Sequence, residues 1–295
     1  MAGRPAPVPP SPSMTWHFTE DPAAFRAAAG ALLSAEPARN TGVLTLVDTA
    51  GRLGWWTEPD GRVTGVLVVT EPGKPVFGTV TPEAARALAS LPDLFGGEGV
   101  TALRGETAAV EAFAEATGRP WTATFRMRLF RLGTLTPPDP APAGRARLAT
   151  AADVPLAAAW AREFVRDLGE EPGEDCTGPV TKRISDGRML LWEAEAEAET
   201  ETEAEEADGR PVSMACFSPV TEGQSRVHLV YTPPAARGRG YAAGVTTAVT
   251  RAARDAGAAQ VLLFTDLANP TSNALYRRLG YRPVTDHLTV AFTGR

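Results

Sequence analysis

Hydrophobic and polar positions in the first half of the chain predict helices and strands in mixed order. A helix is expected from Asp21 to Ala35, with Asp21 as its N-cap and Pro22 at its first position. Alternating positions over 41–48 predict a strand. The Asp-Gly pair of Glu58-Pro59-Asp60-Gly61 predicts a hairpin turn between two apolar runs. The other predicted strands are 53–57, 62–70, 100–104 and 121–132, and the other helices open at Thr81-Pro82-Glu83 and cover 107–117.

A proline-rich stretch, GTLTPPDPAPAGR at 133–145, precedes a second half with the same kinds of element. Proline interrupts sheets and helices, so we place a domain boundary there. The predicted strands of this half are 147–149, 188–193, 211–218, 226–231, 260–265 and 285–292, and the helices are 151–169, 241–256 and 272–279. In helix 241–256 the apolar face is residues 242, 245, 249, 252 and 256, and Gly257 ends it.

Both halves therefore predict an α/β (α+β) fold: a mixed, mostly antiparallel sheet flanked by helices, with one parallel β-α-β unit near each end. A length of 295 residues suits two domains better than one. We expect a disordered tail at 1–14, a first domain at 15–132, a linker at 133–146 and a second domain at 147–295. Residues 193–208, EAEAEAETETEAEEAD, predict an acidic insertion at a hairpin tip, because lengthening a loop costs little.

The net charge of −6 comes from this acidic insertion. The chain has 35 acids and 29 bases, and nine of the acids lie in the insertion, so the remainder has 26 acids against 29 bases, a net charge of +3. A solvated, self-repelling loop explains the insertion, and an acidic interaction arm is the alternative. Nucleic-acid binding gets no support, because there is no basic stripe and no known motif, and no apolar run approaches the roughly 18 residues of a membrane span.

Cysteine and histidine are too few for a disulfide framework or a metal site. Cys176 and Cys216 are expected to be free, buried thiols, and the histidines at 17, 228 and 287 have no ligand spacing. The first 13 residues lack the apolar core of a signal peptide, so we expect a cytoplasmic protein. The excess of arginine over lysine, together with abundant alanine, glycine and proline, is typical of a GC-rich bacterial genome.

One segment predicts a site for phosphates. In VHLVYTPPAARGRGYA, at 227–242, an apolar strand ends at two prolines, a glycine-arginine turn follows, and a helix begins. Backbone N–H groups and the helix dipole make such a helix start an anion site. A P-loop would need Lys-Ser/Thr after the glycines, and the chain has none. A dinucleotide turn fits the spacing from Gly238 to Ala243, but 233–237 separate it from the strand and too little chain follows.

Two motifs in this half resemble those of the GNAT N-acyltransferases. Arg237-x-x-Gly240-x-Ala242 fits the family's acyl-CoA turn, R/Q-x-x-G-x-G/A. The segment NPTSNALYRRLGY at 269–281 is similar to its second motif, N-x-x-S/A-x-x-x-Y-x-x-x-G-F/Y. The resemblance covers about the last half of the chain and implies the GNAT fold there. The first half resembles a degenerate, non-binding copy, with FGGEG at 95–99 in place of the turn, as in two-domain members.

The resemblance implies an acetyl-CoA-dependent N-acetyltransferase with direct transfer to a primary amine and no metal. Tyr276 matches the family tyrosine that protonates the departing sulfur. The base stays open between His228, Glu163, Asp266 and a water chain. The cofactor-binding residues implied are Leu229, Val230, Tyr231, Arg237, Gly238, Arg239, Gly240, Tyr241, Ala242 and Asn269.

The acceptor is expected to be a small-molecule or peptide amine, and the protein a monomer or homodimer with no nucleic-acid or membrane partner. A non-catalytic acyl-CoA sensor or interaction protein is the alternative function.

Overall fold

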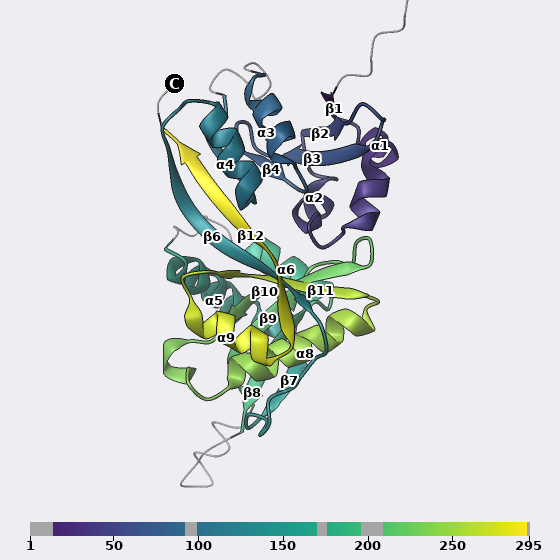
Figure 1. Cartoon of the computed structure of the whole chain (residues 1–295). Coiled ribbons are helices and arrows are strands. Elements are labelled where there is room, and N and C mark those ends of the chain that lie inside the picture. The colour runs from purple at the N-terminus through teal and green to yellow at the C-terminus, as the bar shows by residue number, and fades with distance from the viewer. Residues whose placement is uncertain (1–13, 92–98, 170–175, 196–208, 294–295) are drawn as a thin grey trace, which may run out of the picture. The chain divides into compact units, whose positions relative to one another are not determined.

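The computed structural model describes residues 14–91, 99–169, 176–195 and 209–293, and the chain divides into two compact units (Figure 1). Unit 1 contains residues 1–127 and 285–295, and unit 2 contains residues 128–284. This division differs from the predicted one, because the proline-rich stretch lies inside unit 2 and the end of the chain returns to unit 1. None of the described helices is long and apolar enough to cross a membrane.

Unit 1 has five strands of its own and receives the end of the last strand. Its elements are β1 (Thr15–Thr19), α1 (Pro22–Ala35), α2 (Thr41–Leu46), β2 (Arg52–Thr57), β3 (Val63–Val69), β4 (Pro75–Phe77), α3 (Pro82–Ala89), β5 (Ala102–Glu106) and α4 (Thr107–Ala116). β6 (Trp121–Leu132) and β12 (Tyr281–Phe292) each have residues in both units. The predicted helix start is confirmed, because Asp21 accepts a hydrogen bond from the N–H of Ala23 at 2.8 Å. β4 and β5 form the predicted parallel pair around α3.

Residues 41–48 are predicted as a strand, but 41–46 instead form helix α2 and Val47 is its C-cap. Val43 and Val47 are buried in one core, a spacing of four that places them on the same face of a helix. Buried Asn40 fixes the start of α2 through two contacts: its amide donates to the carbonyl of Glu36 at 3.0 Å and accepts from the N–H of Thr79 at 2.8 Å. The second contact spans 39 residues of sequence, so the local alternation could not reveal it.

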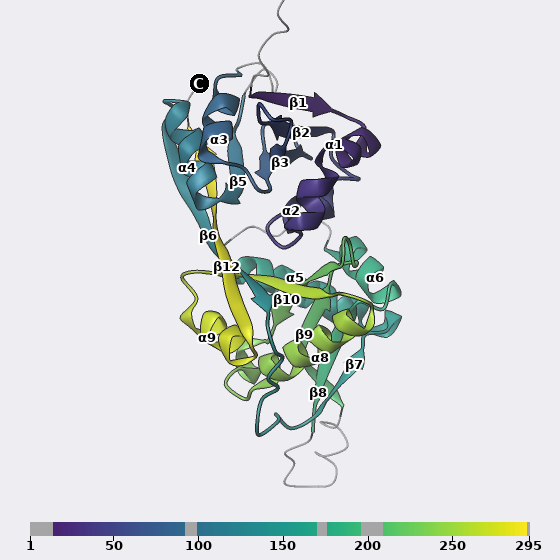
Figure 2. The same ribbon diagram turned by 45° about the vertical axis from the view of Figure 1, so that its right-hand side comes forward.

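Helices cover both faces of the unit 1 sheet, and Figure 2 shows α3 beside α4. Strand β3 explains this arrangement through its continuous apolar run. Val66 and Val68 pack against α1 and α2, whereas Leu67 and Val69 pack against α3 and α4. A strand covered on both faces needs apolar side chains at successive positions.

Unit 2 repeats this plan around its own strands. Its elements are β7 (Arg145–Leu148), the 3-10 helix η1 (Ala151–Asp153), α5 (Val154–Asp167), α6 (Thr177–Ser185), β8 (Met189–Ala194), β9 (Arg210–Phe217), β10 (Gln224–Tyr231), the 3-10 helix η2 (Pro234–Ala236), α8 (Tyr241–Asp255), β11 (Gln260–Asp266) and α9 (Pro270–Arg278). The strand order is β6-β11-β10-β9-β8-β7, and β10 and β11 form the predicted parallel pair around α8. Leu190 and Trp192 of β8 pack with α8, and Met189 and Leu191 pack with α5 and α6.

The buried face of α8 differs from the predicted apolar stripe. Val245 and Val249 are buried as predicted, but Ala256 is exposed and follows the helix. Thr246 and Thr250 are buried instead, and the Thr250 hydroxyl shares a hydrogen bond of 2.7 Å with the hydroxyl of Tyr281. Gly257 ends the helix as predicted, with a φ of +98°.

A nearly buried ion-pair network joins β7 to β8 and to the start of α5. Arg147 donates to Glu193 and makes a bidentate pair with Asp153 at 2.7 and 2.8 Å. The side chains of Glu193 and Asp153 are only 10% and 11% exposed. The prediction that Glu193 opens a solvated tract is therefore wrong, because Glu193 belongs to β8. Residues 196–208, the rest of the acidic insertion apart from Ala194 and Glu195, lie outside the described residues.

Replacing Arg147 by alanine is expected to destabilise the protein by about 3–5 kcal/mol, because nearly buried Asp153 loses its cation and Glu193 keeps only the contact with exposed Arg145. Its hydrogen bonds hold the pKa of Asp153 at about 2, below the ordinary 3.8. This contribution is present above pH 3.8 and is lost as the pH falls toward 2, so the variant should differ less from the wild type at pH 2.5 than at pH 7. Urea unfolding at both pH values measures the difference.

Arg145→Ala is the matched control for this experiment. Arg145 also contacts Glu193, at 3.3 Å, but its side chain is 77% exposed. An exposed ion pair contributes about 0–1 kcal/mol. Equal losses for the two variants would contradict a network held by Arg147.

Candidate active site

β10 bends at a bulge where its pairing with β11 ends. The parallel pairing stops at Val227, and the register with β9 shifts between His228 and Tyr231. Leu229 has a φ of +52°, a left-handed conformation that costs a residue with a Cβ about 1–3 kcal/mol. Within the described strands the backbone of Leu229 and Val230 takes no part in pairing with β11. Backbone strain of this kind is concentrated at functional sites in proteins, so the bulge is a candidate part of the site.

The turn between β10 and α8 presents backbone N–H groups at the start of a helix. Gly238 and Gly240 have φ values of +83° and +81°, which strain any residue with a Cβ. Gly240 is the N-cap of α8, so no side chain caps the helix, and in the described chain the N–H groups of Tyr241 and Ala242 meet no acceptor. A Cβ on Gly238 would have no atom within 4 Å, which leaves space for a ligand. The turn therefore fits an anion such as a pyrophosphate.

Arg237 braces this turn against α5. It donates to Asp167 at 2.5 Å and to the carbonyl of Thr232 at 2.9 Å, and its guanidinium lies 5.9 Å from the centre of the Tyr231 ring. A phosphate at the turn would compete with Asp167 for this guanidinium. Exposed Arg239 stays a predicted phosphate contact.

Tyr231 contacts α5 through its hydroxyl, which donates to Glu163 at 2.6 Å. Burial, and then the neighbouring carboxylate, raise the pKa of Tyr231 to about 12, so the hydroxyl keeps its proton at neutral pH. Glu163 is exposed and is held beside the end of β10, a position that suits a base. Asp266 is less suited, because its carboxylate accepts from the N–H of Ala268 at 2.8 Å and caps that turn.

His228 lies against Cys216, with 3.2 Å between Nδ1 and Sγ. Burial, with three arginines nearby, lowers the pKa of His228 to about 3, and burial raises that of Cys216 to about 12. A histidine with so low a pKa is a weak base, so we set His228 aside. Cys216 is buried as predicted, whereas Cys176 is half-buried, and both are free thiols. Among the described residues no cluster of histidine, cysteine and carboxylate side chains could hold a metal ion.

Asn269 and Tyr276 lie at the start and near the end of helix α9. Asn269 is the N-cap, and its side-chain oxygen accepts from the N–H of Ser272 at 3.0 Å. Tyr276 is 7% exposed, and its ring packs against Tyr281 with 6.1 Å between ring centres. Burial raises the pKa of Tyr276 to about 12. Tyr276 is therefore protonated at neutral pH, which an acid requires.

Sequence reasoning missed Asn273, which lies between these two residues. Its amide donates to the carbonyls of Asp266 and Asn269 at 2.7 and 2.8 Å. The family motif leaves this position variable, so the resemblance did not indicate it. The sequence feature that could have indicated Asn273 is an amide side chain three positions before Tyr276, which places the two on the same face of a short helix.

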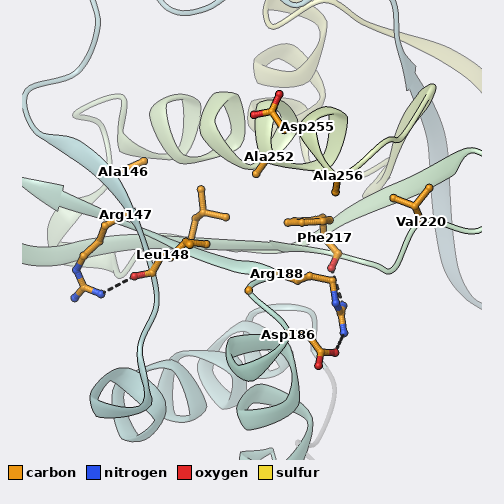
Figure 3. Close-up of a pocket in the computed structure, with 12 residues that line it drawn as sticks. Ala146, Arg147, Leu148, Asp186, Arg188, Phe217, Val220, Ala252, Asp255 and Ala256 are labelled. Carbon is orange, nitrogen blue, oxygen red and sulfur yellow. Dashed lines mark hydrogen bonds and ion pairs between the residues drawn. The ribbon is translucent and has the colours of Figure 1, made fainter.

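Figure 3 shows a cavity of about 620 Å³ near the other end of α8. Ala252 and Asp255 of α8, Leu148 of β7 and the ion pair between Arg188 and Asp186 line part of it. None of the predicted site residues lines this cavity. We therefore place the candidate active site at the bulge and the glycine turn.

Unit 1 has a turn in the equivalent place, between β4 and α3. Here the N–H of Thr79 donates to Asn40, and the Thr79 hydroxyl donates to Glu36 at 3.3 Å. A Cβ on Gly78 would lie 2.4 Å from the Asn40 oxygen. Protein oxygens thus accept the hydrogen bonds that Thr79 donates at this turn. The predicted counterpart at 95–99 lies outside the described residues except for Gly99.

Comparisons with known proteins agree with this geometry. Residues 163–281 match the family model described as "Acetyltransferase (GNAT) family". Similar solved structures include a GCN5-related N-acetyltransferase from Sphaerobacter thermophilus, with 15% identity and a TM-score of 0.59 over 94% of this chain and 95% of that one. One from Kribbella flavida has 22% identity and a TM-score of 0.57 over 92% and 96%.

A tandem GNAT protein from the clavulanic acid biosynthesis pathway has 11% identity and a TM-score of 0.50 over 95% of this chain and 99% of that one. At these identities the likeness shows the fold, and it confirms the predicted duplicated architecture. No curated protein matches the sequence.

Proposed function

The chain belongs to the GNAT acetyltransferase family through residues 163–281, and from this premise we propose that it transfers the acetyl group of acetyl-CoA directly to a primary amine. The observation that carries the proposal is the glycine turn, whose N–H groups at Tyr241 and Ala242 meet no acceptor in the described chain. It follows a bulged strand that leaves the backbone of Leu229 and Val230 outside the pairing with β11. Both features suit a ligand with an anionic end and an extended arm.

The residues of the chain would divide the chemistry among them. Acetyl-CoA, when bound, supplies an acetyl group activated as a thioester. The amides of the glycine turn would bind the pyrophosphate, and the backbone at Leu229 and Val230 would orient the arm. Glu163, held by Tyr231, would take the proton that the amine loses, and Tyr276 would give a proton to the departing sulfur. The carboxylate of Glu163 beside β10 supports an amine as the acceptor.

The acceptor is proposed to be a small-molecule or peptide amine. The acceptor's identity, the oligomeric state, the absence of nucleic-acid and membrane partners, and the cytoplasmic location stay predictions.

Replacing Gly238 by alanine is expected to weaken acetyl-CoA binding at least about tenfold, because the new Cβ enters the space beside the turn and the φ of +83° becomes strained. Gly257→Ala is the matched control: its φ is +98°, and no atom lies within 4 Å of its Cβ position either. It should cost similar stability and leave binding unchanged. Calorimetry with acetyl-CoA measures both.

Two outcomes would contradict the proposal, one from calorimetry and one from an assay of turnover. No binding by the wild type at high micromolar acetyl-CoA would exclude a coenzyme A protein altogether. Binding without turnover on any amine would favour the acyl-CoA sensor instead.

A further inference from the structure

Arg237 is held by protein groups beside the glycine turn. A terminal nitrogen donates to the Asp167 carboxylate at 2.5 Å, and Nε donates to the carbonyl of Thr232 at 2.9 Å. The guanidinium also lies 5.9 Å from the centre of the Tyr231 ring. Asp167 is the last residue of α5 and Arg237 directly precedes Gly238, so the ion pair joins the turn to a helix end 70 residues earlier in the chain.

The ion pair is open to solvent on both sides, because the side chains of Arg237 and Asp167 are each 49% exposed. Water screens such a pair, and both side chains lose freedom in forming it, so the pair is weak. Arginine pairs with a phosphate through the same planar N–H groups that it uses for a carboxylate. A phosphate at the turn therefore meets a guanidinium whose charge a carboxylate already balances.

Arg237 keeps two other contacts if this carboxylate is removed. The carbonyl of Thr232 accepts from Nε, and the Tyr231 ring lies beside the guanidinium. Both groups are neutral, so neither opposes the approach of an anion. Asp167 differs, because its negative charge lies within hydrogen-bonding distance of the group that would receive the phosphate. We therefore expect the carboxylate to cost a phosphate more through its charge than it returns by holding the arginine.

We propose that Asp167 lowers the affinity for coenzyme A by competing with its pyrophosphate for Arg237, and thereby speeds release of the product. The inference rests on the proposed function, which places the pyrophosphate at the glycine turn. Acetyl-CoA and the product coenzyme A carry the same pyrophosphate, so the competition acts on both. Product release limits turnover in many enzymes, and affinity differences between related complexes lie mostly in the dissociation rate. Asp167 acts through Arg237 rather than on the reacting atoms.

Calorimetry and stopped-flow displacement with coenzyme A test the proposal on the full chain. Asp167→Asn keeps the shape of the side chain and removes its charge. It is expected to bind coenzyme A about threefold to fivefold more tightly, as an exposed ion pair allows, and to release it more slowly by a similar factor. Asp48→Asn is the matched control, because Asp48 pairs with Arg26 at 2.7 Å in unit 1 and its loss should change neither quantity.

A double-mutant cycle shows whether the gain passes through Arg237. Arg237→Gln alone should weaken binding, and adding Asp167→Asn to it should leave that weaker affinity unchanged. A tighter complex cannot arise from partial unfolding, so the measurement separates this role from a structural one.

Three results would overturn the proposal. Unchanged binding by Asp167→Asn would remove the competition, and weaker binding would make the carboxylate a support of the turn. An equal gain with and without Arg237 would show plain charge repulsion instead. Each of these results would leave the proposed function intact, whereas a wild-type protein that binds no coenzyme A would overturn both.

Discussion

Tyr276→Phe is expected to lower kcat by about 10²- to 10⁴-fold and to leave acetyl-CoA binding within about twofold, because only the acid is removed. Burial holds the pKa of Tyr276 at about 12, so its hydroxyl is protonated through the neutral range. The phenylalanine ring keeps the packing against Tyr281, whose centre lies 6.1 Å away. Steady-state kinetics with a responsive amine, together with calorimetry, separates the loss of turnover from any loss of binding.

Tyr281→Phe is the control for this experiment. Tyr281 is also buried, but its hydroxyl is shared with Thr250, so its loss should lower stability by about 1 kcal/mol and change kcat little. The pH profile gives a further check on Tyr276. Because burial raises the pKa of Tyr276 to about 12, its hydroxyl should keep its proton above pH 10, the ordinary pKa of tyrosine. Turnover that depends on this proton should therefore fall only as the pH approaches 12. Unchanged turnover in the phenylalanine variant would remove the acid role.

Local chemistry made several elements of this fold predictable from sequence. Asp21 and Pro22 start a helix, and Gly61, with a φ of +84°, closes the predicted hairpin. Gly238 and Gly240 adopt the left-handed conformation that glycine favours. In each case the deciding interactions lie within a few residues of sequence, so a short pattern contains them.

Other features depend on residues far apart in the chain. The start of helix α2 is fixed by the hydrogen bond between Asn40 and Thr79. Glu193, the first residue of the predicted acidic insertion, pairs with Arg147. His228 has the residue type of a base, but its contact with Cys216 and its burial are set by the strand beside it. The side-chain oxygen of Asn273 is buried with no donor among the described residues, which only the structure reveals. Periodicity and motif spacing carry no record of such contacts.

The final strand depends on such distant contacts as well. Residues 285–292 are predicted as a strand, and the structure shows a strand there, but the sequence assigns it to the second domain. In the structure Leu288 pairs with Gly105 and Val290 pairs with Leu103, both in β5 of unit 1. The first domain as predicted, 15–132, therefore lacks one of its own strands.

Removing residues 285–295 is therefore expected to unfold unit 1. Leu288, Val290 and Phe292 are buried in its core, and losing three such side chains costs roughly 5–9 kcal/mol, comparable to the whole stability of a domain. Hydrogen exchange should show lost protection in β5 and α4, and removal of residues 294–295 alone is the control. Full protection of β5 after the larger deletion would contradict this role, because β5 would then hold its place without its partner strand.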